Sequence, residues 1–217
     1  MLVQPNGVAV RATPGKEPLF SFGVIADVQY ADIPDGRSFL GVPRYYRHSI
    51  TVLQRAVRAW NAADKQHVRF CVNFGDIVDG FCPKDRSLPA VQAVVAEFAR
   101  FHGPAYHMLG NHCLYNLPRT KLVSLLRMPT AAAAAEARAY YDFSPFPGYR
   151  FVVLDAYDFS AGGYGVDGRG VHHRTLEAAL ECPPGTDAFG RVDVYLDRMA
   201  LVGTGRMRST DMPLPSD

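Results

Sequence analysis

Three apolar runs in the first half of the chain each end in polar residues that can bind a metal ion. The runs are FSFGVIAD, which ends at Asp27, VRFCVNFGD, which ends at Asp76, and PAYHMLGNH, which ends at Asn111 and His112. A continuous apolar run bounded by turn residues predicts a strand buried on both faces. Because open α/β sheets place their chemistry at the carboxyl ends of parallel strands, we expect these three ends to meet at one edge of a sheet.

Helical periodicity separates these runs. Apolar residues at three- and four-residue steps predict helices over 44–63, 88–102 and 117–127. Strands are expected over 19–27, 68–74, 106–109 and 149–154. The alternation predicts an α/β architecture with parallel strand pairs and right-handed crossovers. Near the end of the chain, 192–202 is typical of two short strands around a turn, and we expect an antiparallel hairpin at the sheet edge.

The length of 217 residues suits one domain with a sizeable core. We expect a flexible leader over 1–18, a single domain over 19–207 and a flexible tail over 208–217. The segment 30–43 is rich in turn residues and is expected to form a loop over the crevice.

Composition excludes several classes of function. The net charge is +2 and the basic residues are scattered, so nucleic acid is not expected as a partner. Stretches of about 18 consecutive apolar residues are missing from the sequence, so we expect no membrane span. The four cysteines show no CxxC or framework spacing, which favours reduced thiols and a cytoplasmic location. Oligomeric state cannot be derived from the sequence.

The residue types at the three strand ends suit two divalent cations. Asp27 and Gln29 lie two apart, so an extended backbone points both side chains the same way, toward one cation. Asp76 has two oxygens and can bridge two cations, while Asn111 offers an amide oxygen to the second. Asp79 is better placed to support the loop than to bind metal. A lone aspartate after a strand would instead indicate a helix cap or a turn.

His112 follows Asn111 and would reach the substrate side, where it could stabilise or protonate a leaving oxygen. Elsewhere, His48, His67, His102 and His107 are expected to be surface or satisfied core residues. Three arginines, at positions 37, 44 and 47, are candidates to contact phosphate, but a solvated face is the simpler interpretation.

The combination of DVQ at 27–29, GDIVDG at 75–80 and GNH at 110–112 resembles the calcineurin-like metallophosphoesterase superfamily. Gln29 replaces the usual histidine of the first motif. Nearly the whole chain is similar to the manganese-dependent ADP-ribose/CDP-alcohol diphosphatase family. Four further segments carry this similarity: GNHCLYN, YRFVVLDAYD, GVHHRTLEAALECPPGTDAFG and DVYLDRMALVGTGRM. The resemblance implies hydrolysis of a pyrophosphate bond in a small nucleotide such as ADP-ribose or CDP-choline.

The resemblance also implies roles for individual residues. Asp27 and Gln29 would bind one metal, Asp76 both, and Asn111 the other, while His112 would act on the substrate. The ions would be Mn²⁺, although the ligand types also allow Mg²⁺, Fe²⁺ or Zn²⁺. The fold implied is the calcineurin-like sandwich, incomplete in this chain.

One departure from the family pattern concerns the metal ligands. The superfamily completes its site with a later histidine and a G-H-x-H motif, and the only histidines after His112 are His172 and His173 in GVHH. The chain runs from Asp158 almost directly into Gly162, which indicates an internal deletion near 160–162. The deletion would remove three imidazole ligands, weaken metal binding and expose apolar area on the sheet face. His172 and His173 are the histidines left in the sequence that could substitute as ligands.

Two alternatives to an active diphosphatase therefore remain. One is a catalytically impaired form that acts as a binding remnant or is an unstable product. The other is a different metallophosphoesterase, such as a protein phosphatase or phosphodiesterase.

Overall fold

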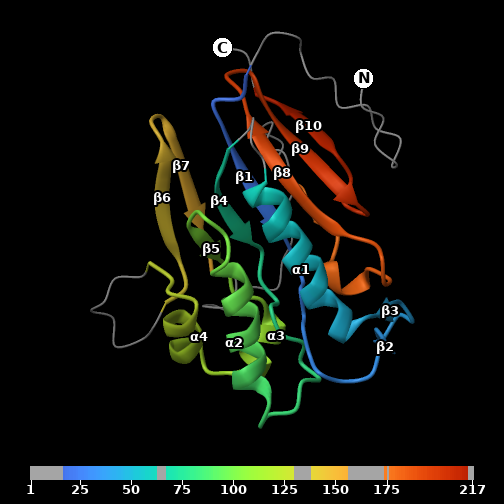
Figure 1. Cartoon of the computed structure of the whole chain (residues 1–217). Helices are drawn as coiled ribbons and strands as arrows, with labels where there is room; N and C mark the ends of the chain where they lie inside the picture. Colours follow the sequence, from blue (N-terminus) through green and yellow to red (C-terminus); the bar gives the residue numbers. More distant parts are fainter. Residues whose placement is uncertain (1–16, 63–66, 130–137, 156–173, 175, 215–217) are drawn as a thin grey trace.

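The computed structural model describes residues 17–62, 67–129, 138–155, 174 and 176–214. A mixed six-stranded sheet lies at the centre, with helices over one face and a β-hairpin over the other (Figure 1). Its strands are β1 (Phe20–Ile25), β4 (Val68–Asn73), β5 (Ala105–His107), β8 (Ala188–Val194), β9 (Arg198–Gly205) and β10 (Thr210–Pro213). The strand order is β10-β9-β8-β1-β4-β5. β1, β4 and β5 are parallel, and β8, β9 and β10 continue the sheet antiparallel.

The helices confirm the periodicity of the sequence. They are α1 (Tyr46–Asn61), α2 (Ser87–Phe98), α3 (Asn111–Asn116) and α4 (Arg119–Leu125). The apolar stripe of α1 is buried against the sheet, and its Trp60 is so close to β1 that a Cβ on Gly23 would lie 2.5 Å from the indole. The Trp60 Nε1–H also donates to the carbonyl of Gly190 at 3.1 Å. Trp60 therefore fastens α1 to both β1 and β8.

Two very short strands, β2 (Gly36–Arg37) and β3 (Pro43–Arg44), pair within the loop predicted over 30–43. A 3₁₀ helix, η1 (Ala179–Glu181), contacts the end of β1. The N–H of Leu180 donates to the carbonyl of Asp27 at 2.9 Å. The C-terminal part of the chain therefore supports the turn that carries Asp27.

The second layer is the hairpin of β6 (Tyr141–Phe146) and β7 (Tyr149–Val153). Its aromatic face packs on the central sheet, with Phe151 in edge contact with Phe22 and Phe70 at ring-centroid distances of 5.2 and 5.3 Å. Its outer face is open: Val152 is 62% exposed, Leu154 just after β7 is 76% exposed, and Arg150 forms an exposed ion pair with Asp142. The exposed Val152 and Leu154 agree with the expected loss of covering segments.

Three predictions about the later strands need correction. The predicted fourth strand, 149–154, is β7 and belongs to the separate two-stranded sheet. The predicted edge hairpin is wrong in position, because β8 pairs with β1 inside the sheet and is buried on both faces. The predicted tail over 208–217 is wrong for Thr210–Pro213, which forms the true edge strand β10 against β9.

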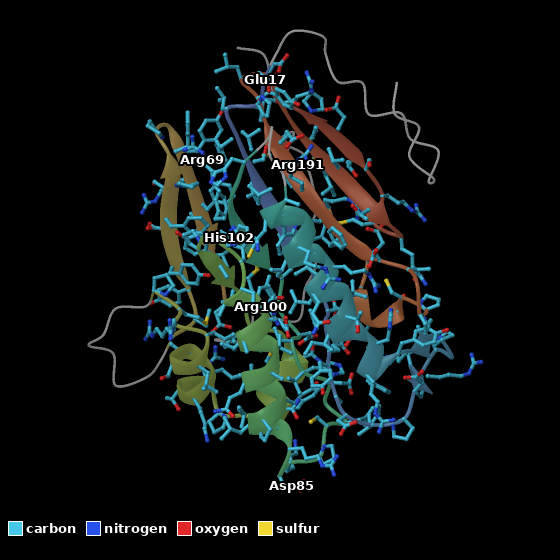
Figure 2. The ribbon with its side chains drawn as sticks, in the orientation of Figure 1. Glu17, Arg69, Asp85, Arg100, His102 and Arg191 are labelled. Carbon is cyan, nitrogen blue, oxygen red and sulfur yellow. The ribbon has the colours of Figure 1, made fainter. Side chains whose placement is uncertain are left out.

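Charged side chains are distributed along the whole molecule. Glu17 and Asp85 lie at opposite ends, with Arg69, Arg100 and Arg191 between them (Figure 2). The four cysteines are buried and free, as their spacing suggested. Among the described residues, no helix is long and apolar enough to cross a membrane.

Candidate metal centre

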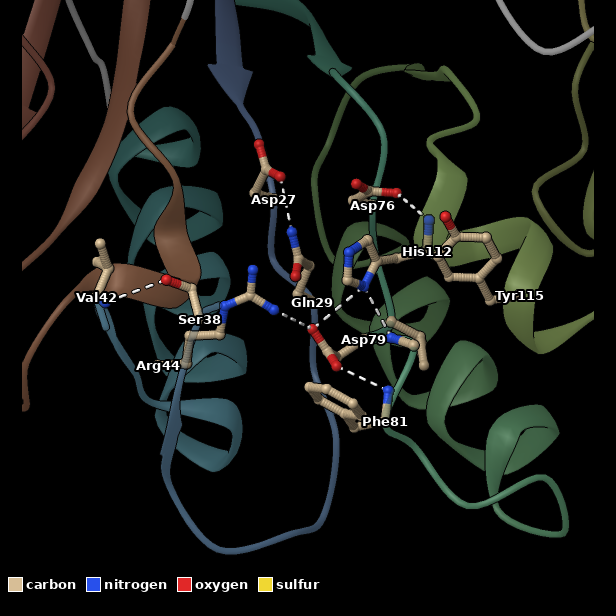
Figure 3. Close-up of polar contacts among 12 residues, drawn as sticks. Asp27, Gln29, Ser38, Val42, Arg44, Asp76, Asp79, Phe81, His112 and Tyr115 are labelled. Atoms are coloured by element: carbon tan, nitrogen blue, oxygen red, sulfur yellow. Dashed lines mark hydrogen bonds and ion pairs between the residues drawn. The ribbon is translucent and has the colours of Figure 1, made fainter. Parts of the chain in front are cut away.

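The loops that follow β1 and β4 are joined by backbone hydrogen bonds. The N–H of Gln29 donates to the carbonyl of Asp76 at 2.7 Å, and the N–H of Tyr30 donates to that of Ile77 at 3.0 Å. Parallel pairing of β1 with β4 brings the two loops to the same sheet edge, as the sequence pattern predicted. Asp27, Gln29 and Asp76 therefore lie side by side (Figure 3).

All three of these residues adopt left-handed backbone conformations. Their φ angles are 51° at Asp27, 40° at Gln29 and 50° at Asp76. A non-glycine residue in this region costs roughly 1–2 kcal/mol because its Cβ approaches the following carbonyl. The bonds between the loops hold this strain in place, and strained backbone of this kind clusters at functional sites.

Gln29 presents an amide oxygen without a protein partner. Its side chain is buried, and its Nε2 donates to Asp27 Oδ1 at 2.8 Å. Within the described part of the chain, its Oε1 has no hydrogen-bond partner. A buried polar atom left unpaired is costly, about 1–3 kcal/mol. A cation would satisfy this oxygen, so the residue fits a metal ligand.

Burial makes both carboxylates costly to ionise. Burial raises the pKa of Asp27 to about 6, and the neighbouring charge of Asp76 adds a smaller part of the shift. Burial also raises the pKa of Asp76, while His112 opposes the effect. A divalent ion between them would offset both costs.

The start of α3 holds Asp76 from the other side. The backbone N–H of His112 donates to Asp76 Oδ1 at 2.9 Å. A Cβ on Gly110 would lie 2.0 Å from this oxygen, so only glycine allows α3 to approach Asp76 so closely. This contact brings Asn111, the first residue of α3, to the same site. Its Nδ2 donates to the Tyr115 hydroxyl at 3.2 Å.

His112 contacts a buried acidic residue behind the site. Its Nδ1 accepts a hydrogen bond from the backbone N–H of Gly80 at 2.9 Å, and the same nitrogen lies 3.3 Å from Asp79 Oδ2. The hydrogen bond with Asp79 raises the pKa of His112, and burial opposes it. Asp79 is fully buried, and Arg44 Nη1 donates to the same Oδ2 at 3.2 Å (Figure 3). Asp79 therefore orients the histidine and stays behind the metal-binding residues.

Sequence reasoning underestimated Arg44 and missed Asn116. Arg44 was interpreted as part of a solvated face, yet its side chain is mostly buried against Asp79. The Asn116 Nδ2 donates to the carbonyls of Asp79 and His112, both at 2.8 Å, and its Oδ1 accepts from Ser87 at 2.8 Å. No local pattern in the sequence indicated Asn116, because its partners Asp79 and Ser87 come from other elements.

The other predicted histidines lie away from this site. His107 is buried in the core with its pKa lowered to about 4 by burial, and His102 precedes β5 (Figure 2). His172 and His173, like the predicted deletion point, lie outside the described residues. In the described part of the chain, no group of three or more His, Cys, Asp or Glu residues could hold a metal. The donors brought together are two carboxylates and two amides.

Comparison with known structures defines the class. A crystal structure of a dimetal phosphatase from Danio rerio matches with a TM-score of 0.81 and 26% identity, over 92% of this chain and 100% of that chain. No family model matches the chain. The fold is that of a dimetal phosphatase of the calcineurin-like class, as the fold-class prediction stated.

Sequence comparison gives the family. A relative from Oryza sativa subsp. japonica is 46% identical over 98% of this chain and 99% of its own length. A relative from Arabidopsis thaliana is 43% identical over 90% of this chain and 97% of its own length. A relative from Homo sapiens is 39% identical over 74% of this chain and 49% of its own length. Each is named a manganese-dependent ADP-ribose/CDP-alcohol diphosphatase. The chain belongs to this family.

The alignment also bears on the internal deletion. It extends over 326 positions, whereas this chain has 217 residues, so at least 109 positions of the alignment hold no residue of this chain. Because the alignment covers 98% of this chain and 99% of the rice protein, these positions lie between the matched ends. The chain therefore lacks a large internal part of its relative, and a deletion near 160–162 stays the prediction for its place.

Proposed function

We propose that this chain hydrolyses the pyrophosphate bond of small nucleotide diphosphate compounds such as ADP-ribose and CDP-alcohols, giving two monophosphates. The observation that carries the proposal is the junction of the two strained loops, where Asp27, Gln29 and Asp76 meet with an unpaired buried amide oxygen. The family supplies the substrate class, because the relatives are named for these compounds.

In this proposal Asp27 and Gln29 hold one ion, Asp76 contributes to both, and Asn111 holds the other. When bound, two divalent ions neutralise phosphate oxygens and lower the pKa of a bound water. Manganese is the expected metal, since the relatives are named manganese-dependent. Mg²⁺, Fe²⁺ and Zn²⁺ are the alternatives that oxygen and nitrogen ligands allow.

His112 is the proposed catalytic residue on the substrate side. Its contact with Asp79 raises its pKa, which favours the protonated imidazole. A protonated His112 can donate a proton to the leaving phosphate oxygen. Arg44 balances the charge of Asp79 behind it.

The second candidate is a chain that folds and binds without turnover. The missing internal part favours it, because the described residues hold no cluster of three or more His, Cys, Asp or Glu ligands. Membership of the diphosphatase family argues against the other alternative, a protein phosphatase or phosphodiesterase. A cytoplasmic location is also proposed, supported by four free buried thiols.

Hydrolysis by the purified chain tests the proposal. ADP-ribose and CDP-choline are incubated with Mn²⁺ and the wild-type chain, beside Asp76→Asn, which removes a charge and keeps the shape. We expect turnover of at least one compound and a loss of about 100-fold or more in the variant, since Asp76 contributes to both ions. A folded wild type without turnover would favour the non-catalytic candidate.

A further inference from the structure

Tyr115 lies on α3 one turn after Asn111, and its hydroxyl is 3.2 Å from the Asn111 Nδ2, which donates to it. The ring is also close to His112, with 5.5 Å between the ring centroids. The sequence analysis assigned no role to this tyrosine. Its side chain is 58% exposed, so burial does not explain its position.

The position of Tyr115 is fixed by the protein around it. Its carbonyl accepts a hydrogen bond from the Lys84 ammonium group, which ties α3 to the loop after β4. A Cβ on Gly80 would lie 3.0 Å from the Tyr115 ring, so the ring packs directly on this loop. The hydroxyl is therefore held at a position where it accepts from the Asn111 NH₂ group.

The direction of that amide decides whether Asn111 can bind a metal. A primary amide has an oxygen at one end and an NH₂ group at the other, and only the oxygen is a metal ligand. We propose that Tyr115 is a positioning residue: by accepting from the Asn111 NH₂ group, its hydroxyl holds the amide so that the oxygen is presented to the divalent ion. The inference rests on the proposed metal site.

A purely structural tyrosine would behave differently. A hydrogen bond on an exposed side chain contributes little to folding, typically about 0.5–1.5 kcal/mol at most. A residue that orients a metal ligand instead affects metal affinity, by about 10–100-fold. The two roles are separated by measuring metal affinity and metal-free stability on the same variant.

Calorimetric titration with Mn²⁺ tests the inference on Tyr115→Phe, which loses only the hydroxyl. The matched control is Tyr140→Phe, because Tyr140 is 46% exposed and its hydroxyl accepts from Arg138 at 2.9 Å. We expect Tyr115→Phe to weaken Mn²⁺ binding about 10-fold or more and to leave the metal-free melting temperature unchanged. Tyr140→Phe should change neither.

A double-mutant cycle with Asn111→Asp adds a second test. A carboxylate presents an oxygen in both orientations, so it does not need the tyrosine to choose between them. In the Asn111→Asp background, Tyr115→Phe should cost less than about threefold in Mn²⁺ affinity. An equal loss in both backgrounds would overturn the inference.

The remaining outcomes separate this inference from the proposed function. If the wild type binds Mn²⁺ and Tyr115→Phe binds it equally well, the positioning role is wrong and the metal site stands. If the wild type binds no Mn²⁺, both are wrong. Binding that falls in step with the metal-free melting temperature would indicate a structural role and would also overturn the inference.

Discussion

Asp27 shows how the site opposes folding when no cation is bound. The pKa of Asp27 is raised from 3.8 to about 6, so between these values the folded chain holds a proton that the unfolded chain has released. The stability of the metal-free fold therefore falls as the pH rises through 6. The shift corresponds to about 3 kcal/mol at pH 7. The same carboxylate is ionised and ready for a divalent ion at that pH.

Asp27→Asn should stabilise the metal-free chain at neutral pH. The amide keeps an oxygen that can accept from Gln29 Nε2 and removes the buried charge. We expect a gain of up to about 3 kcal/mol at pH 7 and little change at pH 4, measured by urea unfolding in chelator. Asp35→Asn, at an exposed aspartate, is the control and should change neither value. Destabilisation by Asp27→Asn at pH 7 would contradict the electrostatic account.

The juxtaposition of the candidate metal ligands was predictable from the sequence, and their backbone conformation was not. DVQ and GDIVDG at strand ends identified Asp27, Gln29 and Asp76, because the carboxyl ends of parallel strands meet. Their left-handed conformations depend on hydrogen bonds between two loops about 50 residues apart. Local sequence carries no signal for such bonds. Asn116 was missed for the same reason, since its partners Asp79 and Ser87 come from other elements.

At the scale of elements, α3 is the part on which the site depends most. It has only six residues, too few to be stable alone, so its position comes from side-chain contacts with its surroundings. The Asp76 carboxylate accepts a hydrogen bond from the backbone N–H of His112 in the first turn of α3. Near the end of α3, the Lys84 ammonium group donates to the carbonyl of Tyr115, and the Asn116 side chain donates to the carbonyl of Asp79. These contacts keep Asn111 and His112 in place.

Asn116→Leu should release α3 from that loop. The change removes the Nδ2 donor to the carbonyls of Asp79 and His112, and it leaves the Ser87 hydroxyl with the carbonyl of Pro83 alone. We expect a loss of about 2–4 kcal/mol in the free energy of unfolding, together with weaker Mn²⁺ binding. Asn61→Leu is the matched control, because Asn61 also makes two hydrogen bonds to backbone but is only partly buried. Equal effects of the two substitutions would mean that Asn116 has no special role.

The parallel half of the sheet followed from the sequence, whereas in the antiparallel half only the hairpin of β8 and β9 did. Long apolar runs and amphipathic helices made β1, β4, α1 and α2 predictable. β8, β9 and β10 are joined in the sheet by long-range pairing, and β10 has only four residues. The aromatic residues of β7 predicted a strand, but its place on the opposite layer depends on packing against Phe22 and Phe70.

At the scale of the whole molecule, the two sheet layers differ in size. The central sheet has six strands, whereas the second layer has two strands in the described residues. The rice relative aligns over at least 109 further positions. The exposed Val152 and Leu154 at the hairpin agree with this loss. The loops that carry Asp27, Gln29 and Asp76 follow β1 and β4 of the six-stranded sheet, so they form without the absent part.

The most direct test is the rate of ADP-ribose hydrolysis by the wild-type chain measured across a Mn²⁺ titration, beside the full-length rice relative. Our account predicts turnover that depends on Mn²⁺, with half-saturation at a concentration about 10–100-fold higher than the relative requires, because part of the ligand set is missing. A folded chain that shows no turnover at any Mn²⁺ concentration, or turnover that persists in chelator, would contradict it.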